Sequence, residues 1–289
     1  MKRHQQKTKS KNILALLLTI ASFAMPVSAQ TIGEDELTAP QVVMHSLMAG
    51  AGGTNVLDSY LSPYNYTGLD ITLIRETMRP TKLMQGKVHV QTLFQINGSI
   101  LENRAKTANE YAGGIRYGIN WQYTWQLAEG LKVMAGPGAS AYLGGIYNER
   151  NSNNPMQAKG DVMIDLSAQA FYNFHLLKRQ WILRYEMILP FCGMAFTPNY
   201  GQLYYEALML KNYDKNLQFA HFANSPSMRH LLTLSMPMKS AVVRVGLSAN
   251  FQQQELNGLK HHSYNTNIMV GFAKYFNRKS TTRNQVLPF

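Results

Sequence analysis

Histidine and carboxylate side chains near predicted loops are the groups in this sequence that could perform acid–base chemistry. They are His221, His261, His262, Asp214 and Glu255. His221 with Asp214 could orient a water molecule or a nucleophile, as general acid–base catalysis requires. The spacing does not demand this, because solvated loop histidines are commoner than catalytic ones. The adjacent His261 and His262 would point to opposite sides of an extended chain, which makes them a poor metal-binding pair.

The sequence contains none of the compact motifs that mark well-known catalytic or nucleotide-binding sites. There is no G-x-S-x-G, no P-loop and no cysteine-rich zinc motif. The single cysteine, Cys192, cannot form an internal disulfide and offers no metal cluster. We therefore assign no catalytic, cofactor-binding or metal-ligating residue and expect no cofactor. Enzymatic activity is the less favoured interpretation.

A second set of ionisable residues alternates with apolar residues along predicted strands. It comprises Asp70, Glu76, Arg116, Asp165, Arg184, Glu186 and Arg244. Because successive side chains of a strand point to opposite faces, these residues would share the inner face of a barrel. Mixed charges in a narrow barrel most often form an ion-pair and hydrogen-bond network that fills the interior. A selectivity ring or a catalytic cluster is the alternative.

The clearest strand pattern runs from Tyr111 to Trp125. Every second residue is apolar or glycine, and the residues between are small or polar with one charge. A typical strand of a soluble protein has about 5–6 residues. This longer strand, with aromatic residues crowded at one end, is typical of a membrane-crossing strand. We expect an aromatic belt at a single interface, formed by Trp121, Tyr123, Trp125, Trp181, Tyr275 and Phe276.

The same alternation recurs along the chain and predicts ten strands. They span residues 41–50, 68–78, 87–97, 111–125, 131–147, 161–175, 181–191, 229–236, 242–252 and 265–276. A bulge or kink is expected at Gly136-Pro137-Gly138, because proline is disfavoured in a central strand. The fold class is therefore all-β, a closed antiparallel up-and-down transmembrane β-barrel of about ten strands.

The predicted connections alternate between long and short, as in outer-membrane barrels with short periplasmic turns and longer outer loops. The short turns lie near Pro80, Glu129, Lys178 and Lys239. The long loops cover residues 52–66, 98–109, 148–160, 192–225 and 253–262. Residues 192–225 could form a lid, a plug or an extra hairpin, and the hairpin would raise the strand count to twelve.

The N-terminus has the three-part layout of a cleaved signal peptide. Basic residues precede an apolar segment, Ile13 to Met25, and small residues precede a cut at Gln30. The domains are then 1–29 signal peptide, 30–276 barrel and 277–289 polar tail. The signal segment holds five of the 28 basic residues and no acid, so the mature charge is 23 − 16 = +7. The basic residues are scattered, which argues against nucleic acid as a partner.

The C-terminal third resembles a known group of sequences. The segments are Pro226 to Leu234, Leu256 to Tyr264 and Met269 to Phe276. They are similar to an uncharacterised family of secreted Gram-negative proteins that carries a domain of unknown function. The likeness is clear from about residue 190 to 276 and looser from about residue 60. It implies export and is consistent with a barrel, but it implies no activity.

These observations favour an exported barrel protein of the cell outer membrane. Its function would be structural, binding or narrow transport through its extracellular loops, without covalent chemistry. Its expected partners are outer-membrane lipid and a small-molecule or surface ligand. One alternative is a barrel hydrolase acting on lipid or peptide at the outer rim. Another is a soluble periplasmic β-barrel that binds a small apolar ligand.

The facing assignment of the central strand also makes a prediction. We expect Ile115→Arg to impair assembly more than Asn120→Arg, because a charge on the lipid face near mid-membrane costs about 2–4 kcal/mol. The amount of folded protein in a membrane fraction measures the difference.

Overall fold

A computed structural model describes residues 30–31, 42–152, 154–176, 179–211, 215–238, 241–277 and 284–285. The predicted signal peptide, residues 1–29, lies outside the described residues, as does most of the predicted tail. Over the part of the chain that is described, no helix is both long and apolar enough to cross a membrane.

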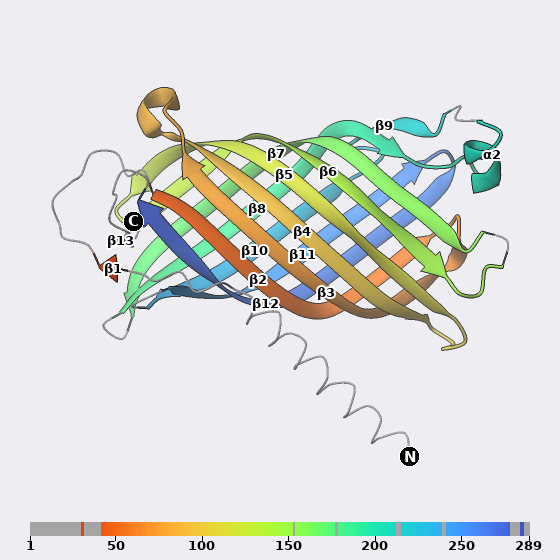
Figure 1. The fold of residues 1–289 in the computed structure, drawn as a ribbon, viewed down its shortest axis with the longest axis horizontal. Helices are drawn as coiled ribbons and strands as arrows, with labels where there is room; N and C mark the ends of the chain where they lie inside the picture. Colours follow the sequence, from red (N-terminus) through yellow and green to blue (C-terminus); the bar gives the residue numbers. More distant parts are fainter. Residues whose placement is uncertain are drawn as a thin grey trace, which may run out of the picture.

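Long antiparallel strands make up nearly all of the structure (Figure 1). The wall consists of β2 (Val42–Asp58), β3 (Ser62–Pro80), β4 (Val88–Asn103), β5 (Asn109–Ala128), β6 (Leu131–Asn148), β7 (Met156–Leu176), β8 (Arg179–Phe196), β9 (Leu217–His221), β10 (Ser227–Pro237), β11 (Val242–Leu256) and β12 (Leu259–Asn277). The helical elements are a 3-10 turn, η1 (Leu83–Gly86), and α2 (Tyr204–Leu208). The two-residue strands β1 (Gln30–Thr31) and β13 (Asn284–Gln285) pair with each other in parallel.

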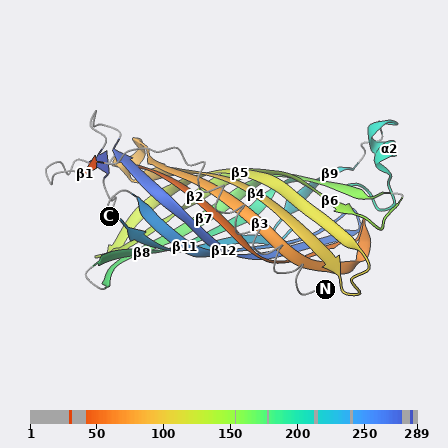
Figure 2. The ribbon, with the colours of Figure 1, turned by 60° about the horizontal axis from the view of Figure 1, so that its bottom comes forward.

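The sheet closes into a ring. Each long strand is antiparallel to its chain neighbour, and β12 pairs with β2 from His261–Asp58 to Asn277–Val42. The circuit is completed where β10 pairs with β8, from Arg229–Ile188 to Ser235–Ile182. Figure 2 shows the tilted strands running round the barrel. The prediction of a closed ten-stranded antiparallel barrel is confirmed.

One wall strand is built from two pieces. β9 pairs with the last part of β8, and β10 pairs with its first part. Residues 222–226 between them bond to both neighbours, through Phe222 N to Phe191 O (3.1 Å) and Gln253 N to Pro226 O (2.8 Å). β9 and β10 therefore act as a single wall strand. Residues 202–210 and 217–222 form no extra hairpin, so the twelve-stranded alternative is wrong.

Strands extend into four of the five predicted long loops and shorten them. β2 and β3 meet at residues 59–61, β4 and β5 at 104–108, β6 and β7 at 149–155, and β11 and β12 at 257–258. The long connection is 197–216, which carries α2. The prediction failed because alternation stops where the outer face turns polar, whereas backbone pairing continues beyond that point.

Pro137 does not interrupt the register. It pairs with Leu166 of β7, and β5 and β6 keep one register on both sides of it, from Asn120–Gly138 to Tyr123–Ala135. Register shifts occur instead at Val56/Asp58, Gln126/Ala128 and Ile164/Asp165. Of the predicted bulge or kink at Gly136-Pro137-Gly138, the bulge is therefore wrong, and pairing with β5 is interrupted locally between Asn120–Gly138 and Tyr123–Ala135. Proline is tolerated because β6 loses backbone hydrogen bonds to β5 only next to Pro137.

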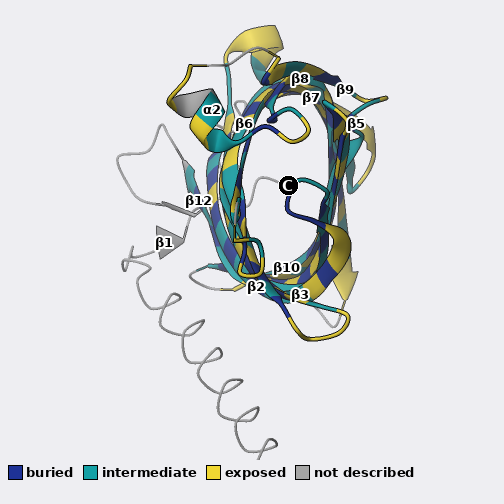
Figure 3. Cartoon of the chain, turned by 90° about the vertical axis from the view of Figure 1, so that its right-hand side faces the viewer, coloured by how far each residue is buried: buried dark blue, intermediate teal, exposed yellow. Residues whose placement is uncertain are grey.

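Side chains alternate between an apolar exterior and a buried interior, as Figure 3 shows by colour. On β5 the exposed set is Tyr111, Ile115, Tyr117, Trp121 and Trp125. The predicted belt residue Tyr275 is an exception: it is 2% exposed and packs inside the barrel. Phe276, the next residue along β12, points to the opposite face of the sheet, so the assignment of both residues to one belt was wrong.

Asn120 points into the barrel, so Asn120→Arg is not a suitable control for Ile115→Arg. Asn120 is 1% exposed, and its Nδ2 donates to Gln91 Oε1 at 3.0 Å. A guanidinium has no space there, so Asn120→Arg would also impair assembly. A valid control must lie on the exterior.

Candidate functional site in the barrel lumen

Among the described residues, polar side chains from many strands converge in the lumen. We call the end of the barrel with the Glu129–Gly130 turn the turn end, and the opposite end, which carries α2, the α2 end (Figure 1). The half of the lumen near the turn end is packed with side chains. The half near the α2 end contains a chamber. These two halves have different chemistry.

A buried ion network crosses the lumen near the turn end. Arg184 of β8 donates to Glu76 of β3 on the opposite wall, with Nη1 to Oε2 at 2.7 Å and Nη2 to Oε1 at 2.5 Å. Arg184 Nη2 also contacts Glu186 Oε2 at 2.8 Å. Arg244 Nη1 reaches Glu76 Oε2 at 3.3 Å. All four side chains are at most 3% exposed, and their charges balance.

Carboxamides extend this network to the other strands. Gln91 Nε2 donates to Glu76 (2.8 Å) and to Glu186 (2.6 Å). Gln169 Nε2 donates to Gln91 (3.0 Å) and to Gln122 (2.8 Å), and Gln122 in turn donates to Ser167. Six strands therefore contribute to one polar layer. Buried charges are tolerated in such a site because nearly every group has a partner.

An apolar layer lies between this network and the turn end. Phe171 touches both layers, with the Arg184 guanidinium 5.4 Å from its ring centroid. The layer consists of Val42, Met44, Met78, Met134, Phe171, Ile182, Val242, Ala273 and Tyr275, each at most 8% exposed. The two layers together fill the lumen at the turn end.

The seven ionisable residues predicted to face the lumen all do so, in separate groups. Glu76, Arg184, Glu186 and Arg244 share the network above. Asp70 accepts from Ser99 (2.6 Å), Thr72 (2.8 Å) and Asn267 (2.6 Å). Arg116 pairs with Asp161 (3.1 Å), and Asp165 pairs with Arg229 (2.7 Å). The predicted structural network is confirmed.

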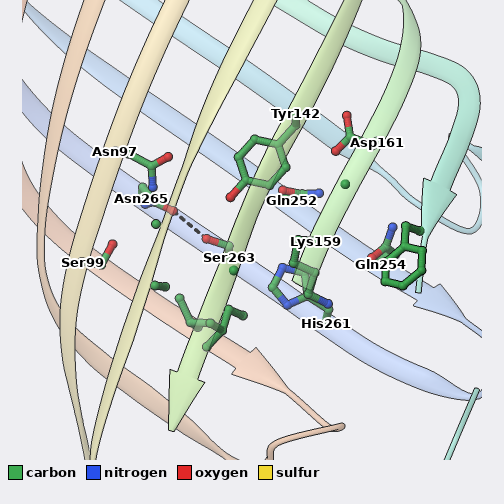
Figure 4. Close-up of a pocket in the computed structure, with 17 residues that line it drawn as sticks. Asn97, Ser99, Tyr142, Lys159, Asp161, Gln252, Gln254, His261, Ser263 and Asn265 are labelled. Carbon is green, nitrogen blue, oxygen red and sulfur yellow. Dashed lines mark hydrogen bonds between the residues drawn. The ribbon is translucent and has the colours of Figure 1, made fainter. Parts of the chain in front are cut away.

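The half of the lumen near the α2 end contains a chamber (Figure 4). Its non-atom space is about 530 Å³, part of it open to solvent. Its polar lining includes Asn97, Ser99, Tyr142, Lys159, Asp161, Gln252, Gln254, His261, Ser263 and Asn265. The space continues toward the network past Arg116, Arg229 and Asn250. The chamber therefore has a floor and is blind at the turn end.

Two glycines create room in this chamber. A Cβ at Gly114 or at Gly144 would collide with the Tyr142 ring, which lies flat against the wall at that point. Arg116 covers the ring, with its guanidinium carbon 4.6 Å from the centroid. A larger residue at either glycine would push Tyr142 into the open space. The chamber thus depends on residues that sequence alternation marks only as small.

A further charged cluster lies at the α2 end of the chamber. Lys159 Nζ contacts Asp58 Oδ2 at 2.6 Å, and His261 Nδ1 lies 3.2 Å from the same oxygen. Sequence reasoning missed this cluster because all three residues were assigned to loops. The presence of acidic and basic residues close to a strand end was the available signal.

The segment 197–216 is docked at the rim of the barrel. Tyr60 Oη donates to Gln202 O (2.8 Å), and Tyr204 Oη accepts from Ala158 N (2.7 Å). Burial raises the pKa of both Tyr60 and Tyr204 to about 12, so these hydroxyls stay neutral. α2 lies beside the opening in Figure 3 and does not cross it. Of the three predicted roles for residues 192–225, a plug is not formed by the described residues of this segment, 192–211 and 215–225.

The predicted rim histidines have other partners. His221 Nδ1 accepts from Ala223 N at 3.1 Å within its own turn, and Asp214 lies outside the described residues. His261 faces the lumen, whereas His262 faces out and stacks on Tyr264, which confirms their opposite directions. Glu255 is exposed and lies 3.9 Å from Lys260. Within the described ranges, no group of three or more His, Cys, Asp or Glu residues could hold a metal ion.

Comparison with known proteins places the chain in a family. Residues 12–283 match the family model described as Protein of unknown function (DUF3316). The chain belongs to this family. No curated protein sequence matches it.

Similar solved structures share the barrel shape at low sequence identity. One is the transport unit of the autotransporter AIDA-I from Escherichia coli, at 9% identity and a TM-score of 0.46, covering 91% of this chain and 96% of that one. Another is Ail, the attachment invasion locus protein of Yersinia pestis, at 9% identity and a TM-score of 0.28, covering 80% and 98%. At this level of similarity, neither likeness carries a functional inference.

The buried network makes a stability prediction. Arg184→Met leaves Glu76 and Glu186 with one cation between them, and breaking such a pair costs about 3–5 kcal/mol. Arg184→Met/Glu186→Gln restores charge balance, so we expect it to recover part of that loss. Urea unfolding followed by tryptophan fluorescence measures both variants. Equal stability of Arg184→Met and the unmodified protein would contradict the importance of this network.

Proposed function

We propose that this protein is an outer-membrane barrel that does not conduct, and that it acts as a binding or structural protein at its α2 end. The observation that carries the proposal is a seal made of two packed layers of side chains in the lumen. The buried side chains of the Arg184–Glu76 layer and of the apolar layer around Phe171 lie across the lumen, one layer behind the other. A transport role would need both layers to move. Binding at the α2 end needs neither to move.

The exterior supports insertion in a membrane. Exposed apolar side chains project from strands all round the barrel, including Leu69, Phe94, Ile115, Leu143, Ile164, Leu183, Leu232, Leu247 and Ile268. Soluble monomers rarely expose an apolar patch larger than a few hundred Å². A closed barrel also pairs its backbone groups without water, which lipid requires. This belt favours the membrane over the soluble periplasmic alternative.

The hydrolase alternative has less support. It placed His221 with Asp214, and His221 is held in a local turn. The Asp58–His261 pair is better placed for proton transfer, but its partner is the Lys159 ammonium, and no Ser, Thr or Cys side chain is hydrogen-bonded to it among the described residues. Binding therefore remains the better-supported function.

The lipid-facing assignment can be tested on a single strand. Ile71 faces outward between Leu69 and Leu73, whereas Thr67 faces outward four residues closer to the α2 end. We expect Ile71→Arg to reduce the heat-modifiable, folded protein in the membrane fraction, because a mid-membrane arginine costs about 2–4 kcal/mol. Thr67→Arg lies near the interface, where the cost falls to about 0–1 kcal/mol. Equal yields from the two variants would refute the assignment.

The seal can be tested by conductance. Purified protein in a planar bilayer should give no stepwise current, with an open porin as the positive control. Phe171→Ala/Arg184→Ala/Glu186→Ala thins both layers while removing one charge of each sign. If this variant still shifts with heating on a gel, we expect it to conduct. Regular current steps from the unmodified protein would overturn the proposal.

A further inference from the structure

The chamber and the sealed half use carboxamides in opposite ways. In the seal, Gln91, Gln122 and Gln169 are bonded to one another. In the chamber, within the part of the chain that is described, the side-chain amides of Asn97, Asn250, Gln252 and Gln254 donate and accept no hydrogen bond. These four residues line the cavity and are partly exposed to it. They come from β4 and β11.

The charged groups around the same space neutralise one another. Arg116 pairs with Asp161, and Arg229 pairs with Asp165. Lys159 pairs with Asp58. Each cation has a carboxylate within 3.1 Å, so the wall offers no unpaired charge to an ionic ligand. What remains available to a ligand is a set of neutral groups that both donate and accept hydrogen bonds.

We propose that the chamber binds a small neutral polyhydroxylated ligand through Asn97, Asn250, Gln252 and Gln254. A carboxamide can donate to one hydroxyl and accept from its neighbour, which suits vicinal hydroxyl groups. The non-atom space of about 530 Å³ includes open solvent, so the ligand must be small. The inference rests on the proposed binding function, because the sealed floor makes the chamber a place of binding rather than of passage.

The geometry of the wall explains why this site is at the α2 end. Gly114 and Gly144 let the Tyr142 ring lie flat, which keeps the centre of the lumen open at this level. Closer to the turn end, the buried inward residues include Asn120 and Gln122 on β5 and Met134 on β6. A ligand that enters at the α2 end therefore meets the carboxamides before it meets the seal.

The test is a binding measurement on the purified full-length barrel. The detergent should be a polyoxyethylene ether, because sugar-based detergents would compete for the site. Saturation-transfer NMR with glucose, galactose, mannose, N-acetylglucosamine and trehalose identifies a binder, and calorimetric titration then gives its Kd. We expect at least one of these sugars to bind, and glucose 6-phosphate to bind no better than glucose.

Adjacent residues on β11 provide matched variants. Gln252 and Gln254 face the chamber, whereas Gln253 faces outward and donates to Tyr264 Oη at 2.5 Å. We expect Gln252→Ala and Asn97→Ala each to weaken binding about 3- to 10-fold, which corresponds to one hydrogen bond. Gln253→Ala should leave the Kd unchanged. Gly144→Val, which displaces Tyr142 into the cavity, should abolish binding, and heat-modifiability on a gel verifies that each variant is folded.

Three results would overturn the inference. They are the absence of binding by every neutral sugar tested, stronger binding of glucose 6-phosphate than of glucose, and equal losses in Gln252→Ala and Gln253→Ala. The conductance measurement separates this failure from a failure of the proposed function. If the barrel neither conducts nor binds a sugar, the proposed function stands and the proposed ligand class is wrong. If it gives regular current steps, the lumen is open and the proposed function is wrong.

Discussion

Closure of the hydrogen-bonded sheet is the constraint on which the rest of this structure depends. Ten antiparallel strands meet through the β12–β2 pairing, so the wall has no free edge along its main length. A ring of this size encloses a narrow interior, and side chains must occupy most of it. Alternation along each strand then forces a choice at every inward position. The chain fills one half with charges, carboxamides and apolar groups, and it leaves space in the other half.

The division of the lumen links packing to function. Near the turn end, Arg184 and Glu76 meet from opposite walls, and carboxamides occupy the space round them. Near the α2 end, charges pair beside the wall and leave carboxamides unpaired. The same residue types therefore close the barrel at one level and line a cavity at the other. At the α2 end, glycines at 114 and 144 let the Tyr142 ring lie against the wall.

Much of the fold could be read from alternation, because a barrel strand repeats one simple rule. All ten strands and all seven inward charges were predicted, Glu76 and Arg184 among them. The ends of the strands at Asp58 and Lys159 were not predicted. Alternation of apolar residues indicates how far the apolar exterior extends, and backbone pairing extends further. Tyr275 was wrongly assigned to the aromatic belt. Tyrosine is common in such belts, but position 275 lies on the inward face of its strand. The chamber was beyond prediction, because Asn97 and Gln252 meet only through the registers of several intervening strands.

The seam between the first and last wall strands has a consequence for assembly. Arg244 of β11 and Glu76 of β3 lie on either side of it, and Arg244 Nη1 also donates to Ser46 of β2 at 3.0 Å. A slip of two residues between β12 and β2 would keep every inward side chain inward, so the hydrophobic pattern alone would accept it. It would, however, carry Arg244 about 6.6 Å along the strand from its partners. These contacts thus let a folding chain distinguish the correct closure from a near-identical wrong one.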